Sequence, residues 1–133
     1  MLAYEDAGAA ADWLCRAFGF SEDPNARRTD ADGVVGHAEL EHDGERIFLA
    51  TPNKHYQAPK RHRQGCRAAN RWLDNPFVID GVFVEVADLD AHCERARSAG
   101  ANILREPEEP GVGFRIYAAE DPEGHRWMFG ART

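Results

Sequence analysis

The segment Glu120-Asp121-Pro122-Glu123-Gly124-His125-Arg126-Trp127-Met128-Phe129-Gly130 carries the strongest structural signal in this chain. Pro122 presets φ for a turn and Gly124 accepts a positive φ, so the residues from Asp121 to Gly124 predict a tight turn. The residues after the turn are half apolar, as in a strand. A hairpin is therefore expected at this end of the sequence.

An earlier stretch, Asp43-Gly44-Glu45-Arg46-Ile47-Phe48-Leu49-Ala50, matches the last strand at an offset of 80. Ile47, Phe48 and Leu49 then correspond to Trp127, Met128 and Phe129. The predicted helix ends Phe18-Gly19-Phe20 and Ala99-Gly100-Ala101 match at an offset of 81, which also superposes the first strands of the two halves. The chain is therefore predicted to repeat one module.

Each half has the pattern β-α-β-β-β. In the first half, a helix capped by Asp6 and ended by Gly19 follows a short strand, and an Asp-Gly turn joins two later strands. In the second half, Asp88 caps the helix and Gly100 ends it. The expected strands are 2–5, an irregular one within 21–33, 34–40 and 45–50, and then 77–86, 103–104, 114–118 and 126–129. The predicted class is α+β.

Length and composition predict one compact domain over residues 1–133. Module 1 covers about 1–51, a loop covers 52–76 and module 2 covers about 77–130. The chain is 43% apolar but has no apolar run near the roughly 18 residues that a membrane span needs, and Met1–Asp6 does not resemble a signal peptide. Three cysteines without metal-type spacing suit reduced thiols. We therefore expect a cytoplasmic protein without membrane contact.

The net charge of -7 is unevenly distributed, because residues 1–51 carry -7, residues 52–76 carry +5 and residues 77–133 carry -5. Overall acidity disfavours nucleic acid as a partner, since phosphate contacts need a continuous positive surface. The basic stretch 52–76 is long for a simple connection. It is predicted to be a functional loop with a helical turn around Arg67–Leu73, and a solvated linker is the alternative.

These features resemble the vicinal oxygen chelate superfamily, in particular its glyoxalase/bleomycin-resistance branch. The resemblance rests on the tandem modules, Val-Phe-Val-Glu-Val-Ala-Asp-Leu-Asp-Ala at the second helix entry, Ser-Ala-Gly-Ala at its exit, and the final Asp-Pro-Glu-Gly-His-Arg-Trp-Met-Phe. It is strongest over residues 77–130, and His37-Ala38-Glu39-Leu40 is similar to another strand of that branch. It implies that each module forms a curved half-barrel and that paired modules enclose a cavity.

The resemblance also locates the positions where metal-using members have His, Gln or Glu ligands, on the first and last strand of each module. In this chain those positions fall before Met1 and at Phe48, Gly81 and Met128, which offer no donor for a hard cation. We therefore expect neither a metal at the usual site nor a cofactor. The spacing His37-x-Glu39-x-Glu41 leaves a displaced metal site as an alternative.

Alternation along strands predicts which side chains line the cavity. Val82, Val84, Ile47, Leu49, Trp127, Phe129, Ala38, Leu40, Phe114 and Ile116 are assigned to the core. The side chains assigned to the cavity with Phe48, Gly81 and Met128 are His37, Glu39, Glu41, Arg46, Ala50, Phe83, Glu85, Arg115, Tyr117 and Arg126. Trp72 from the basic loop is expected to close over this lining, and Arg115 is expected to pair with Glu39 or Glu85.

Three functions compete. The first is a metal-independent protein that sequesters an aromatic or polar small molecule, using His37, Glu39, Phe48, Trp72, Phe83, Glu85, Arg115, Tyr117 and Met128. The second is a glyoxalase-like lyase or isomerase, with His37 as base oriented by Glu39 or with a displaced metal. The third is an interaction module using the basic loop. Open sheet edges and the resemblance together predict a homodimer.

Overall fold

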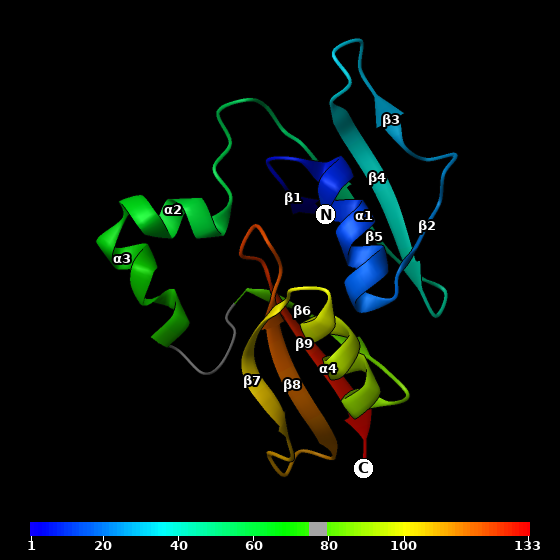
Figure 1. Ribbon diagram of the computed structural model, residues 1–133, viewed down its shortest axis with the longest axis vertical. Helices are drawn as coiled ribbons and strands as arrows, with labels where there is room; N and C mark the ends of the chain where they lie inside the picture. The colour runs from blue at the N-terminus through cyan, green and yellow to red at the C-terminus, as the bar shows by residue number, and fades with distance from the viewer. Residues whose placement is uncertain (75–79) are drawn as a thin grey trace. The chain divides into compact units, whose positions relative to one another are not determined.

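The computed structural model describes residues 1–74 and 80–133. They form two compact units, Met1–Ala58 (unit 1) and Pro59–Thr133 (unit 2). Each unit has its own mixed sheet and a helix packed on it (Figure 1). The predicted α+β class with tandem modules is confirmed, and the modules form two separate sheets.

Unit 1 contains β1 (Leu2–Ala3), α1 (Ala7–Phe18), β2 (Ser21–Glu22), β3 (Arg28–Thr29), β4 (Val35–His42) and β5 (Glu45–Ala50). The strand order is β1-β5-β4-β2, and β3 also pairs with β4. β1 is parallel to β5, and the other pairs are antiparallel. The irregular strand expected within 21–33 is thus two short strands.

Unit 2 begins with helical residues, α2 (Pro59–Gly65), α3 (Arg67–Asn70) and the 3-10 turn η1 (Arg71–Asp74). Then come β6 (Gly81–Glu85), α4 (Leu89–Ser98), β7 (Asn102–Glu108), β8 (Phe114–Glu120) and β9 (Arg126–Arg132), with strand order β6-β9-β8-β7. Again the first strand is parallel to the last. This order repeats that of unit 1, so the predicted repeat is confirmed. Residues 77–79 of the expected first strand lie outside the described residues.

The helix caps match the sequence expectations but change one detail of the repeat. Asp6 accepts a hydrogen bond from the Ala9 amide at 2.9 Å, and Asp88 accepts one from the Ala91 amide at 3.0 Å. Leu2 lies opposite Leu49, while Val84 lies opposite Phe129. The first strands and the caps therefore correspond at an offset of 82, and the predicted 81 is wrong there. The difference is taken up within the helices, because α1 has 12 residues and α4 has 10. The left-handed glycines that follow them, Gly19 and Gly100, are 81 residues apart.

The turn before β9 is held by a buried carboxylate. Asp121 is 3% exposed; its Oδ1 accepts hydrogen bonds from the backbone amides of Glu123 (3.1 Å) and His125 (3.0 Å). Its Oδ2 accepts one from the indole Nε1 of Trp127 at 3.1 Å. Gly124 has φ 91°, as the turn prediction requires. One side chain thus joins the turn to the core.

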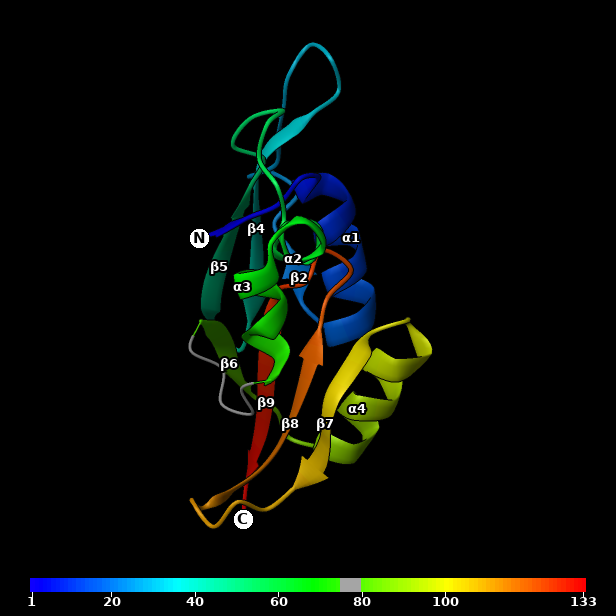
Figure 2. The ribbon, with the colours of Figure 1, turned by 90° about the vertical axis from the view of Figure 1, so that its left-hand side faces the viewer.

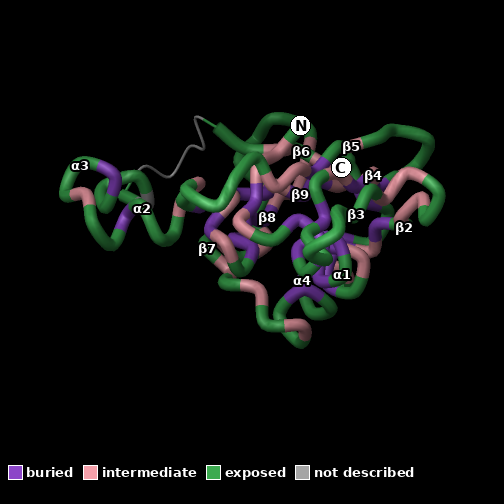
Figure 3. Tube along the Cα trace, turned by 90° about the horizontal axis from the view of Figure 1, so that it is seen from above, coloured by how far each residue is buried: buried purple, intermediate pink, exposed green. Residues whose placement is uncertain are grey.

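Each sheet has one face covered by its own helix (Figure 2). On the covered faces, Ala38, Leu40 and Leu49 in unit 1 and Trp127 and Phe129 in unit 2 are fully buried. Purple segments in Figure 3 mark buried residues along the strands and within α1 and α4. The opposite faces are here called the open faces. No described helix is long and apolar enough to cross a membrane.

Candidate functional site

The open face of unit 1 carries a chain of polar contacts beside an exposed ring. In β4 and β5, His37, Glu39 and Glu41 lie opposite Ala50, Phe48 and Arg46. His37 Nε2 lies 3.1 Å from Glu39 Oε1, and the Arg46 guanidinium donates to Glu39 Oε2 at 2.8 Å. The Phe48 ring is 38% exposed, with its centroid 5.6 Å from that of His37. The structure thus brings these side chains together on one face, as the alternation predicted.

The hydrogen bond to His37, aided by Arg46, lowers the pKa of Glu39. A carboxyl with a lowered pKa is ionised at neutral pH. Glu39 can therefore act as an acceptor that orients His37 or holds a donor group of a ligand.

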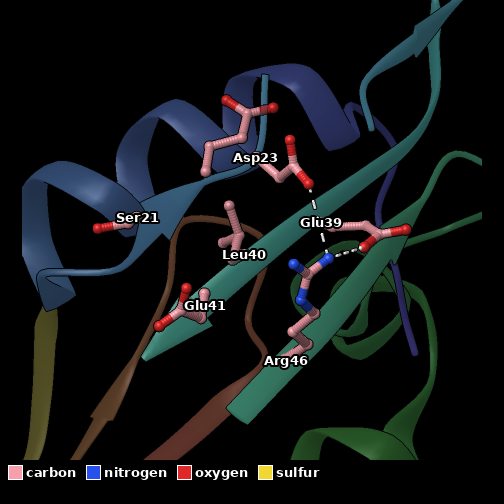
Figure 4. Close-up of a pocket in the computed structure, with 7 residues that line it drawn as sticks. Ser21, Asp23, Glu39, Leu40, Glu41 and Arg46 are labelled. Atoms are coloured by element: carbon pink, nitrogen blue, oxygen red, sulfur yellow. Dashed lines mark hydrogen bonds and ion pairs between the residues drawn. The ribbon is translucent and has the colours of Figure 1, made fainter. Parts of the chain in front are cut away.

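A hollow of about 200 Å³ adjoins these residues. It is lined by Ser21, Glu22, Asp23, Glu39, Leu40, Glu41 and Arg46. In Figure 4, Arg46 points between Glu39 and Asp23, and its guanidinium lies 3.6 Å from the Asp23 carboxylate. Acceptors outnumber donors in this lining, so the hollow suits a group that donates hydrogen bonds.

The spacing of His37, Glu39 and Glu41 does not produce a metal centre. Glu39 is engaged by His37 and Arg46, and Glu41 accepts a hydrogen bond from the Gly44 amide at 3.1 Å. Within residues 1–74 and 80–133, no group of three or more His, Cys, Asp or Glu side chains is placed to hold a metal ion. The displaced metal site is therefore not supported by the geometry.

The open face of unit 2 is apolar and aromatic. Phe83 is 46% exposed and lies opposite Met128. Its ring meets Phe114 edge to face at a centroid distance of 5.5 Å. Gly130 makes room for both rings, because a Cβ there would lie 2.6 Å from Phe83 Cζ. A glycine beneath two rings leaves an apolar surface that a flat group can contact.

Charged side chains border this aromatic surface. Arg132 donates to Glu85 at 2.9 Å, and its guanidinium carbon lies 4.8 Å from the centroid of the Phe114 ring. Such a contact is a cation–π interaction. Glu85 is thus an exposed member of an ion pair at the end of β6.

The prediction for the faces of β8 is wrong. Tyr117 lies opposite Phe129 and stacks on it at 5.0 Å, is fully buried, and its hydroxyl lies 2.7 Å from His92 Nδ1 on α4. Burial raises the pKa of Tyr117. Arg115 pairs with Asp90 on α4 at 2.9 Å, whereas Glu39 or Glu85 was expected. Both residues lie on the covered face, and Phe114 and Ile116 lie on the open one.

The error arises because both faces of β8 are apolar, so alternation alone does not choose between them. The turn length was the usable signal, since the hairpin closes with Glu120 opposite Arg126. Counting back from that pair places Tyr117 opposite Phe129 and Ala118 opposite Met128. By alternation, Phe114 and Ile116 then share the face of Met128. Phe114 and Ile116, which were assigned to the core, thus lie on the open face. Asp23, which lines the hollow beside Arg46, was not predicted.

Trp72 lies on η1 and is 42% exposed. Its ring lies beside His62 of α2, with centroids 5.7 Å apart. The helical turn expected around Arg67–Leu73 is part of a longer helical segment that begins at Pro59. Trp72 is thus on neither sheet.

Two β-α-β-β-β modules with open faces define the class to which the chain belongs. A model of the Glyoxalase/Bleomycin resistance protein/Dioxygenase superfamily matches residues 1–129. The chain is a member of that superfamily, and the resemblance seen in the sequence is confirmed.

Three relatives illustrate the range of similarity. The uncharacterized protein Mb0911c of Mycobacterium bovis is 29% identical, over 97% of this chain and 78% of its own length. The crystal structure of TioX from Micromonospora sp. ML1 is 30% identical, with a TM-score of 0.70 over 99% of this chain and 94% of that one. TnmS3, an antibiotic binding protein from Streptomyces sp. CB03234, is 17% identical, with a TM-score of 0.61 over 99% and 93%. TnmS3 shares the fold.

Proposed function

We propose that this protein is a metal-independent binding protein for a small organic molecule with an aromatic or polar structure. The observation that carries the proposal is the exposed Phe48 ring beside the His37–Glu39–Arg46 contacts. A ring next to oriented polar groups is typical of small-molecule sites. The fold shared with TnmS3, which is named as an antibiotic binding protein, supports it. The aromatic surface around Phe83 on unit 2 offers a second place for a flat ring.

A screen of planar aromatic compounds by thermal shift, with and without a chelator, tests this function. We expect a ligand to raise the melting temperature equally in both conditions. Elemental analysis of the untreated protein should give far less than one equivalent of metal. Stabilisation only in the presence of a divalent ion would contradict the proposal.

Phe48→Asp is expected to weaken binding of such a ligand by about tenfold or more, because stacking on an aromatic ring contributes roughly 0.5–1.5 kcal/mol beyond burial. The melting temperature should change little, since the ring is 38% exposed. Calorimetry with the wild type and the variant measures both quantities. Arg115→Ala is the matched control, because Arg115 pairs with Asp90 on the covered face. Unchanged affinity in folded Phe48→Asp would place the site elsewhere.

The alternative is a glyoxalase-like lyase or isomerase, favoured by the 3.1 Å contact between His37 and Glu39. An ionised carboxylate beside an imidazole orients it as a general base. Under this alternative, a turnover assay would detect a product with the wild type. His37→Ala would abolish its formation and Glu39→Gln would reduce it, without loss of ligand affinity.

We further propose a homodimer in the cytoplasm. The strands β1, β2, β6 and β7 are the last members of their sheets and leave edges that another chain can cover. Cys15, Cys66 and Cys93 are present as thiols, which suit a reducing compartment. Light scattering at micromolar concentration should give twice the mass of one chain, and the mass of a single chain would contradict the dimer.

A further inference from the structure

Residues 59–74, here called the basic segment, form a positive surface on an acidic protein. The segment carries five basic side chains and one acidic side chain, a net charge of +4, whereas the whole chain carries -7. Lys60, Arg67 and Arg71 are exposed. Throughout the part of the chain that the structure describes, these three have no acidic side chain at ion-pair distance. Their charge is available to another molecule.

Arg63, another basic residue of the segment, anchors it to the rest of unit 2. Arg63 is 7% exposed and pairs with Glu120, itself 4% exposed, at 2.6 Å. The Lys60 amide donates to the Glu123 carbonyl at 3.0 Å. A Cβ on Gly124 would lie 2.6 Å from the backbone nitrogen of Lys60, so α2 packs directly on the backbone of the β8–β9 turn. The exposed cations therefore stand on a fixed support, which reduces the entropy lost when a partner binds.

The segment also presents an aromatic side chain. Trp72 is 42% exposed, and its ring is next to that of His62. Tryptophan and arginine are the residues that most often dominate binding energy at protein interfaces. A large apolar ring among cations suits a partner that combines negative charge with an apolar side chain.

We propose that the basic segment is a docking surface for a short acidic segment of a partner protein, with Trp72 as its apolar anchor. The charge distribution favours a short partner. Outside the segment the chain carries -11, so a long polyanion such as nucleic acid or an anionic membrane would extend over repulsive surface. At physiological salt, attraction is limited to about 8 Å. A short acidic peptide meets only the segment.

Fluorescence anisotropy with a labelled peptide of Glu and Asp around one central Leu tests the proposal. We expect binding that weakens about tenfold between roughly 50 and 300 mM salt, because exposed charges are screened. Arg67→Glu and Arg71→Glu should each weaken it about fivefold or more, since a reversed charge repels the peptide. Trp72→Ala should weaken it at both salt concentrations. Lys54→Glu, the same charge change at an exposed residue of unit 1, is the matched control and should have little effect.

Several results would overturn the proposal. Equal binding of a peptide with Gln in place of every acid would exclude charge recognition. An equal effect of Lys54→Glu and Arg67→Glu would mean that binding depends on the net charge of the protein and not on the basic segment. Tighter binding of a DNA duplex or of phosphatidylserine vesicles would assign the surface to another class of partner. Melting curves of all variants establish that they are folded, and none of the substituted residues belongs to β4 or β5, the strands that carry the proposed small-molecule face.

Discussion

Asp121→Ala is expected to lower the free energy of unfolding by about 3 to 5 kcal/mol, since an unmet buried donor costs roughly 1–3 kcal/mol. Three donors lose their acceptor, namely the amides of Glu123 and His125 and the indole of Trp127. Asp121 is 3% exposed and Trp127 is fully buried, so water can hardly reach these donors to replace the carboxylate as their acceptor. Urea denaturation followed by circular dichroism measures the loss.

Two variants serve as controls for this prediction. Asp88→Ala removes a helix cap that accepts one hydrogen bond, from Ala91, and should cost about 1 kcal/mol. Asp121→Asn keeps one carbonyl acceptor and should fall between the two. If Asp121→Ala costs no more than Asp88→Ala, the three contacts do not hold the turn.

Glu120→Ala and Arg63→Ala are each expected to cost about 3 to 5 kcal/mol, because either change leaves a buried charge without its partner. The Arg63 guanidinium also approaches the Gly124 carbonyl at 3.4 Å, and Asn102 donates to Glu120 at 3.3 Å. These contacts join α2, β7 and the β8–β9 turn. Either substitution should also make residues 59–74 more sensitive to limited proteolysis, since the anchor of α2 is lost.

The double variant Arg63→Leu/Glu120→Leu tests whether the loss of stability comes from breaking the ion pair or from removing two side chains that act independently. Because it removes both buried charges, it should cost less than the sum of the single alanine changes. Arg97→Ala is the control, since Arg97 and Glu106 form an exposed pair at 2.8 Å whose loss should cost at most about 1 kcal/mol. If Arg63→Ala and Glu120→Ala lower the free energy of unfolding no more than Arg97→Ala does, the pair is not a buried anchor.

Much of the fold follows from local chemistry, and this is why it could be predicted. Asp6 and Asp88 cap their helices as their positions before apolar stripes indicated. Asp43 and Gly44 both adopt positive φ in the β4–β5 hairpin, as an Asp-Gly turn favours. The open face of unit 1 was also predicted, because residues 37–41 of β4 alternate between polar and apolar side chains.

The open face of unit 2 was predicted only in part. Phe83 and Met128 were assigned to it, and the structure places them opposite each other. Arg115 and Tyr117 were assigned to the same face, but they contact α4 and Phe129. An aromatic residue fits either face of a sheet that is apolar on both sides, so side-chain type carries no information about orientation there.

The caps and turns could be predicted because each depends on residues close together in the chain. The repeat and the family could be predicted because such local patterns occur twice in the same order. The covered face of β8 and the burial of Arg63 could be known only from the three-dimensional structure. Arg63 looks like its neighbours in a basic stretch, yet it is buried and pairs with Glu120, a residue far along the chain. The physical reason is that strand register and buried ion pairs are fixed by packing between distant segments, and neither leaves a local pattern in the sequence.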